Sequence, residues 1–152
     1  MTLDSVDTKI LQLLQENSKQ TTKELSLKTN LSVTAVYERI RKLEKMNVIK
    51  KYMVLLDKHK IGKAFTVFCH IKLVKHEKEH ILEFEKEVAK LPEVMECFHV
   101  SGDYDYILKV QVSDMDAFRE FIITKLTAIK SIGSTQSSIS IGEVKNTTEF
   151  IL

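Results

Sequence analysis

Six consecutive residues in the second half of the chain, SGDYDY at 101–106, combine a glycine, two carboxylates and two phenols. Asp103 and Asp105 can pair with a cationic group, and the backbone N–H groups around Gly102 can approach an anion closely. The hexapeptide lies between two segments typical of β-strands, so it is expected to be a hairpin turn. A turn alone does not explain two aspartates and two tyrosines within four residues. A simple turn and a binding turn both remain open at this point.

A second set of side chains that could bind a ligand lies along a helix predicted over residues 33–46. Val36, Ile40 and Leu43 recur at helical spacing and form an apolar stripe. The opposite side is polar and mostly basic, and it consists of Thr34, Glu38, Arg41, Lys42 and Lys45. This side suits a polyanion. The alternative is a solvated face, because amphipathic helices commonly carry charge on their outer side.

The segments before this helix place it in a recognisable motif. Helices are predicted over 4–16, capped by Asp4, and over 22–29, where Thr21 and Glu24 have capping-box spacing. Asn30 suits a tight turn, and Ser32 can cap the third helix. Two short helices joined by a tight turn, the second with a basic outer face, form a helix-turn-helix. In that motif the second helix enters the major groove of DNA.

A β-rich run, 48–56, follows the third helix and is predicted to form a short strand, the wing of a winged helix-turn-helix. Lys50 and Lys51 would then lie near the phosphate backbone. The predicted DNA-contacting residues are Ser32, Thr34, Tyr37, Glu38, Arg39, Arg41, Lys42, Lys45, Lys50 and Lys51.

Charge divides the chain of 152 residues into two halves. Residues 1–60 carry 12 Lys and Arg against 7 Asp and Glu, whereas residues 61–152 carry 11 against 14. A basic front and an acidic back favour two domains, 1–60 and 61–152, the first with a polyanionic partner. The sequence has no apolar run long enough to span a bilayer and no secretory signal. Cys69 and Cys97 lack a ligand spacing, so reduced thiols in the cytoplasm are expected.

The second half alternates strands and helices in a defined order. Strands are predicted over 65–74, 94–101, 106–112 and 135–142, and helices over 77–90 and 115–128. The order βαββαβ is the ferredoxin-like plan, an antiparallel 4-1-3-2 sheet with both helices on one face. The fold class is therefore α+β. The other face of the sheet is left open and is expected to be covered by a second subunit.

The complete pattern resembles the Lrp/AsnC (leucine-responsive, feast/famine) family of transcriptional regulators. The resemblance rests on LDSVDTKILQLLQEN, KELSLKTNLSVTAVYERIRKLEKMNVIKKY, ECFHVSGDYDYILKV and EVK at 143–145. It departs at Val33, where the family often has proline, and at Asn30, where glycine is common; both residues suit the same backbone. The resemblance implies sequence-specific binding of double-stranded DNA and a second domain that senses a small effector, an amino acid.

The resemblance also implies where the effector binds. It places the ligand at the turn, between subunits, with hydroxyls of the last strand taking part. The implied effector-binding residues are Gly102, Asp103, Tyr104, Asp105, Thr135 and Ser137. In this account Asp103 or Asp105 pairs with the ammonium of the amino acid. The expected assembly is a homodimer, and the sequence does not choose among dimer, tetramer and octamer.

The sequence is compatible to different degrees with three classes of function: a ligand-responsive regulator, an enzyme and an architectural DNA-binding protein. An enzyme is disfavoured, because no histidine pairs with a candidate nucleophile, although the βαββαβ fold hosts many enzymes. A metal site is also not expected, because Cys69 and His70 lie on a strand separated by another strand from Cys97 and His99. No cofactor is predicted. The remaining alternative to a ligand-responsive regulator is an architectural protein that bends or coats DNA without sensing a ligand.

Overall fold

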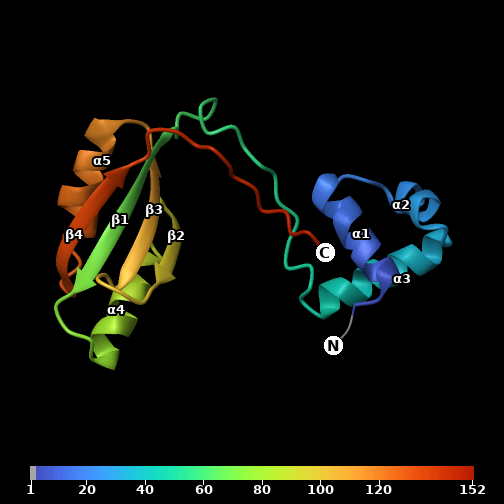
Figure 1. The fold of residues 1–152 in the computed structure, drawn as a ribbon, viewed down its shortest axis with the longest axis horizontal. Helices are drawn as coiled ribbons and strands as arrows, with labels where there is room; N and C mark the ends of the chain where they lie inside the picture. Colours follow the sequence, from blue (N-terminus) through green and yellow to red (C-terminus); the bar gives the residue numbers. More distant parts are fainter. Residues whose placement is uncertain (1–2) are drawn as a thin grey trace. The chain divides into compact units, whose positions relative to one another are not determined.

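The computed structural model describes residues 3–152, which fold into two compact units (Figure 1). The first unit runs to Leu55 and includes the C-terminal segment Lys145–Leu152, and the second unit is Leu56–Val144. Each unit has its own hydrophobic core. None of the helices within residues 3–152 combines the length and the apolar character needed to cross a membrane.

The first unit contains three helices, α1 (Ser5–Glu16), α2 (Thr22–Thr29) and α3 (Val33–Lys45). Their apolar stripes meet in a small core whose fully buried members include Ile10, Leu25, Val36 and Leu43. This is the predicted helix-turn-helix, with α1 packed behind α2 and α3. Burial of these side chains stabilises helices that are too short to be stable alone.

The predicted caps of these helices are confirmed. The Asp4 carboxylate accepts the Asp7 backbone N–H, Thr21 and Glu24 form a reciprocal capping box, and Ser32 accepts the Ala35 N–H. Asn30 adopts the left-handed conformation, φ 55°, that the turn between α2 and α3 requires. Local sequence therefore determines where each helix begins.

The strand predicted over 48–56 is wrong for this structure, because residues 50–57 have no regular secondary structure. A strand exists only when its backbone pairs with another strand, and no segment within residues 3–152 pairs with this one. Its apolar side chains lie in solvent: Met53, Val54, Leu55 and Leu56 are all exposed. The β-forming composition is present, but residues 3–152 contain no strand that pairs with this segment.

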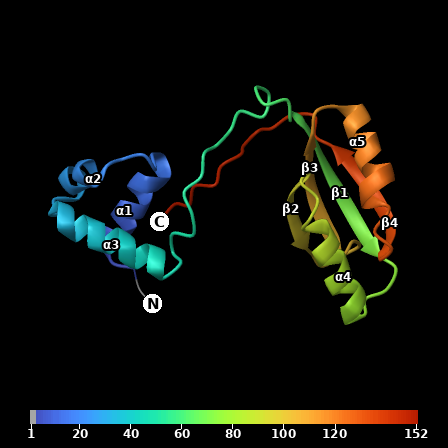
Figure 2. The ribbon, with the colours of Figure 1, turned by 180° about the vertical axis from the view of Figure 1, so that it is seen from behind.

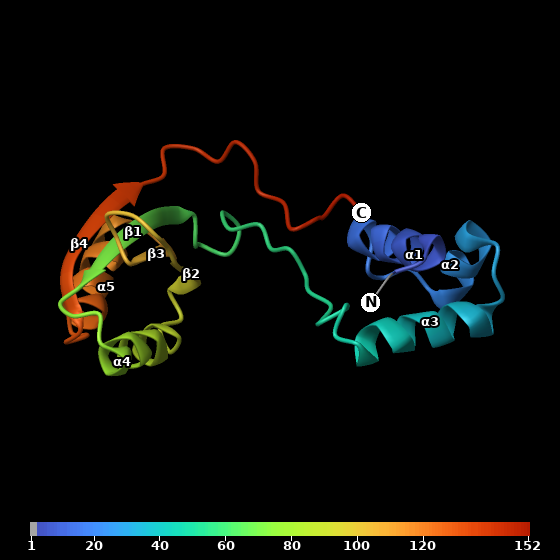
Figure 3. The same cartoon turned by 60° about the horizontal axis from the view of Figure 1, so that its bottom comes forward.

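The second unit is built on one antiparallel sheet. Its elements are β1 (Phe65–Leu73), α4 (Lys78–Val88), β2 (Val94–His99), β3 (Tyr106–Val112), α5 (Met115–Phe121), the π-helical continuation η1 (Ile122–Leu126) and β4 (Ile132–Ile139). The strand order is β2-β3-β1-β4, which is the predicted 4-1-3-2 order counted from the opposite edge. Both helices lie on the same face of the sheet (Figure 3). The predicted fold class is confirmed.

Alternation along the strands separates a covered face from an open face. Val67, Cys69 and Ile71 of β1 are fully buried against the helices, as are the β3 residues paired with them. The open face displays Phe68 and, on β2, Phe98, both of which are exposed. The sheet therefore keeps an uncovered, partly apolar face within this chain.

The last strand begins three residues earlier than predicted, at Ile132 instead of 135. Gly133 lies inside β4, where an added Cβ would come within 3.2 Å of the Val74 backbone nitrogen. The predicted bounds, 135–142, leave out this glycine, which inside a strand permits the close approach of two backbones. A register shift beside Leu73 accompanies this close approach.

Candidate functional site

The outer face of α3 is polar and unpaired. The side chains of Thr34, Glu38, Lys42 and Lys45 are exposed, and within residues 3–152 none has a hydrogen bond or ion pair. Arg41 lies over the ring of Tyr37, with its guanidinium carbon 5.8 Å from the ring centroid. Polar side chains that have no partner among the described residues are available to a ligand.

Other predicted DNA-contacting residues differ in their surroundings. Lys50 and Lys51 follow α3 as exposed, unpaired cations in the part of the chain that the structure describes. Ser32 uses one lone pair of its hydroxyl oxygen to cap α3, so that its hydroxyl proton and a second lone pair remain available for another contact.

Arg39 also lies on α3, but its guanidinium is bound within the unit. Its Nη1 lies 2.6 Å from Asp4 Oδ2 and 2.6 Å from Asp7 Oδ1. The Asp7 side chain is only 5% exposed, so Arg39 neutralises a nearly buried carboxylate and braces α3 against α1. The Asp7 backbone N–H and then Arg39 lower the pKa of Asp4. The structure therefore assigns Arg39 a bracing contact that the sequence did not reveal.

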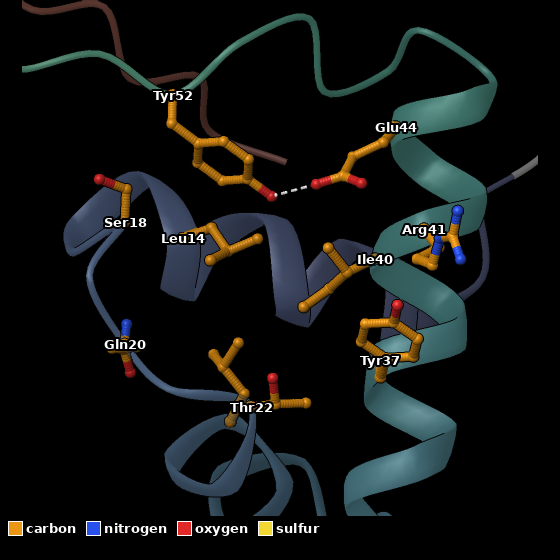
Figure 4. Close-up of a pocket in the computed structure, with 10 residues that line it drawn as sticks. Leu14, Ser18, Gln20, Thr22, Tyr37, Ile40, Arg41, Glu44 and Tyr52 are labelled. Carbon is orange, nitrogen blue, oxygen red and sulfur yellow. Dashed lines mark hydrogen bonds between the residues drawn. The ribbon is translucent and has the colours of Figure 1, made fainter.

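A small open pocket lies beside this face, between the ends of the three helices and Tyr52 (Figure 4). The Tyr52 hydroxyl closes one side by donating a hydrogen bond of 2.8 Å to Glu44. Partial burial, and then this carboxylate, raise the pKa of Tyr52 to about 12. Leu14 and Ile40 supply apolar walls, while Arg41 lies at the rim. No local pattern predicts this pocket, because its walls come from separate helices.

In the second unit, both carboxylate oxygens of Asp105, in the SGDYDY turn, are bonded to other groups of the chain. Its Oδ2 accepts the Leu73 backbone N–H at 2.7 Å, and its Oδ1 lies 2.8 Å from His76 Nε2. Partial burial acts to raise the pKa of Asp105, but the hydrogen bonds from Leu73 and His76 outweigh it and the pKa is lowered. Asp105 thus fastens the turn to the segment that follows β1.

Tyr104 of the same turn reaches over the open face of the sheet. Its hydroxyl donates a hydrogen bond to the Gln136 side chain on β4, and its ring lies 5.2 Å from the ring of His70 on β1. His70 and Gln136 are paired residues of neighbouring strands, so they point to the same side. The Tyr104 side chain is long enough to reach across β1 to β4. The distance between β3 and β4, which β1 separates, did not by itself indicate such a contact.

Thr135 and Ser137 lie on the other side of β4. They pair with Ile71 and Cys69, whose side chains are buried on the covered face. The Ser137 hydroxyl lies 3.8 Å from the Cys69 thiol. Within one chain the structure therefore does not bring these hydroxyls to Tyr104, and their contact with an effector stays a prediction.

The tip of the turn contains its only uncommitted carboxylate. Gly102 has φ 124°, a conformation that favours glycine. The neighbouring Asp103 is exposed and has no bonding partner among residues 3–152. Within that same range, no three His, Cys, Asp or Glu side chains come together in a way that could hold a metal ion.

The two units match two known domain families. Residues 3–50 match the model of a winged helix-turn-helix DNA-binding domain, and residues 66–150 match the model of the Lrp/AsnC ligand binding domain. The chain belongs to the Lrp/AsnC family of transcriptional regulators, with a DNA-binding helix-turn-helix and a ligand-binding domain.

Known proteins resemble this chain over nearly its whole length. The leucine-responsive regulatory protein of Haemophilus influenzae is 37% identical over 99% of this chain and 90% of its own. The Bkd operon transcriptional regulator of Pseudomonas aeruginosa is 33% identical over 93% of both chains. A transcriptional regulator of Neisseria meningitidis, solved as a complex with L-Met, is 34% identical with a TM-score of 0.93, over 99% of this chain and 97% of its own.

Proposed function

We propose that this regulator contacts double-stranded DNA through the outer face of α3 and that a free amino acid, bound at the SGDYDY turn, modulates the contact. The first unit supplies DNA binding, and the second supplies ligand binding and assembly. The observation that carries the proposal is the set of exposed, unpaired side chains on α3, which includes Lys42 and Lys45.

On α3 the roles follow from position. Residues near the start of a recognition helix face base edges, which gives Thr34 and Glu38 the base contacts. Arg41, Lys42 and Lys45 lie further along the helix and, with Lys50 and Lys51, are suited to phosphates. Arg39 takes a supporting part in this proposal, because its guanidinium is already bound to two carboxylates.

The effector follows from the chemistry of the turn. An amino acid carries an ammonium and a carboxylate, and the turn offers the unpaired Asp103 beside N–H groups around Gly102. Asp105 holds the turn in place through Leu73 and His76 and is not the ammonium partner in this proposal. The L-Met complex of the N. meningitidis regulator supports an amino acid as the ligand class.

Assembly as a homodimer is part of the proposal. The open sheet face displays Phe68 and Phe98, and residues 53–56 form an exposed apolar run that pairs with no strand in the part of the chain that the structure describes. Apolar surface of this kind marks an interface, and an unpaired β-forming segment can pair with its copy. Light scattering at micromolar concentration should report a dimer or a multiple of it, and a monomer would contradict the assembly.

A thermal-shift screen of the twenty amino acids tests the effector. A specific binder at a hundredfold excess over Kd should stabilise the fold by about 2.7 kcal/mol. Calorimetry then compares wild type, Asp103→Asn and the control Asp116→Asn, which alters another exposed carboxylate. Loss of a charge-assisted hydrogen bond in Asp103→Asn should weaken binding roughly 10- to 150-fold. If no amino acid binds wild type, the ligand part fails and an architectural DNA-binding protein is favoured.

A further inference from the structure

The C-terminal segment is held on α1 by two glutamines. Gln15 donates from Nε2 to the Phe150 carbonyl at 3.0 Å and accepts the Phe150 N–H on Oε1 at 2.7 Å. Gln12 donates from Nε2 to the Leu152 carbonyl at 3.1 Å. Figure 2 shows the C-terminus beside α1, as does Figure 1.

The spacing of these contacts matches two regular structures. Residues three apart on a helix are neighbours separated by roughly 5–6 Å. Alternate residues of an extended chain are separated by about 6.6 Å. Gln12 and Gln15 meet the carbonyls of Leu152 and Phe150, which are alternate residues of a segment without regular secondary structure, and this spacing fits an extended chain. We call the pair Gln12 and Gln15 the glutamine strip.

The glutamine strip recognises backbone and not side chains. The carboxamide of Gln15 exchanges both a donor and an acceptor with Phe150, as a neighbouring strand would. Meanwhile the side chains of Phe150 and Ile151 remain exposed. The contact buries little apolar surface, so it is weak enough to be released, and the covalent link raises its effective concentration.

The other end of this segment is anchored in the second unit. The Ser140 N–H donates to the Thr66 carbonyl at 3.0 Å, which continues the pairing of β4 with β1. Farther along, Glu143 forms an ion pair of 2.7 Å with Lys58, which lies in the first segment that joins the units. The chain thus connects the units twice, after Leu55 and after Val144. The Lys58–Glu143 ion pair joins these two connecting segments within the second unit.

We propose that the glutamine strip is a docking surface for the chain's own C-terminal segment, and that the docked segment is a second, releasable connection between the ligand-binding and DNA-binding units. With the segment docked, a displacement of β4 is transmitted to α1 through residues 140–152. With it released, only the single connection after Leu55 remains. The coupling part of this inference rests on the proposed function.

Residue-resolved amide exchange on the full chain tests the docking. The Phe150 N–H should exchange slowly in wild type, and Gln15→Ala should abolish its protection. The matched control is Glu16→Ala, because Glu16 is the exposed neighbour on α1 and, within residues 3–152, makes no contact with the segment. Alanine favours helix, so neither change should unfold α1. An unprotected Phe150 in wild type, or equal protection in Gln15→Ala, would overturn the inference.

The coupling is tested by adding a mixed-sequence DNA duplex at low salt. Coupling between sites is reciprocal, so DNA bound to the first unit should alter the exchange of Ser140 in the second. This response should be present in wild type and Glu16→Ala and lost in Gln15→Ala. A Ser140 response that is absent from wild type, or equal in all three proteins, overturns the coupling. Fluorescence anisotropy on the same duplex measures DNA binding itself, and absence of binding would contradict the proposed function. The docking is tested independently, by amide exchange in the free protein.

Discussion

The outer face of α3 and the SGDYDY turn were both predicted as binding sites, but their side chains are in different states. On α3 the side chains of Thr34, Glu38 and Lys42 make no bond within residues 3–152. In the turn, Tyr104 is bonded to Gln136 and Asp105 to Leu73 and His76. Of the two aspartates of the turn, only Asp103 is without a bonding partner among residues 3–152.

The difference reflects the kind of ligand each region is suited to. A polyanion is bound by many cations, each of which contributes independently, so α3 needs exposed side chains more than a fixed geometry. A small zwitterion needs a few groups held in place, and in the turn Asp105 and Tyr104 are held by bonds to the rest of the second unit. The same division occurs within α3, where Arg39 is bound by Asp4 and Asp7, whereas Lys42 has no partner among residues 3–152.

The largest expected effect is on stability, from Arg39→Ala. The change leaves Asp7, only 5% exposed, without its cation. Removal of one partner of a fully buried pair costs roughly 3–5 kcal/mol; Arg39 is itself 30% exposed, so about 2 kcal/mol is expected. Urea unfolding measures it, with Lys42→Ala as the exposed control on the same helix. A loss no larger than that of the control would show that Arg39 does not brace the unit.

Asp105→Asn should have a smaller effect, about 1 kcal/mol, because asparagine still accepts the Leu73 N–H and loses only the charge. The sign of the pH dependence follows from the lowered pKa of Asp105 in the folded state. A lowered pKa contributes stability above the unfolded value of about 3.9, and this stability is lost as the pH falls through the folded value. The difference in unfolding free energy between wild type and Asp105→Asn should therefore shrink as the solution becomes acidic.

Asp103→Asn is the control for this comparison, because Asp103 has no bond to lose in the described part of the chain. Thermal unfolding between neutral and acidic pH distinguishes the two variants. If Asp103→Asn destabilises the protein as much as Asp105→Asn, the two aspartates do not have different roles.

Much of the fold could be predicted because local patterns determine it. The caps Asp4 and Ser32 and the left-handed Asn30 act on neighbouring residues, and all three were correct. The strand order followed from the alternation of strands and helices. The strand over 48–56 was wrong because a strand depends on a partner, and composition cannot supply one.

The candidate sites were less predictable because their contacts join distant residues. Arg39 meets Asp4 from 35 residues away, and Asp105 meets His76 from 29 away. On α3 Arg39 lies at the edge of the apolar stripe, where its side chain can turn either to solvent or to α1. No local pattern distinguishes these outcomes, and the same holds for docking of Phe150 on Gln15.

The smallest expected effect on stability comes from Tyr52→Phe. The lost hydrogen bond to Glu44 should cost about 0.5 kcal/mol, because both side chains are exposed. The pKa of Tyr52 is raised to about 12, so its stabilising contribution is complete below the ordinary value of about 10 and is lost as the pH rises towards 12. Denaturant unfolding should show no change for Tyr37→Phe, whose hydroxyl is unbonded in the described structure. Equal losses would exclude the Glu44 bond as the cause.

A salt titration of DNA affinity tests most directly whether the free face of α3 is the DNA interface. Wild type, Lys42→Ala and the control Lys130→Ala, an exposed lysine of the second unit, are compared on one duplex. Each lost phosphate contact should weaken binding and reduce the slope of log affinity against log salt by about one unit. Lys42→Ala should show this reduction and Lys130→Ala should match wild type. Identical slopes and affinities for Lys42→Ala and wild type would contradict this assignment of Lys42.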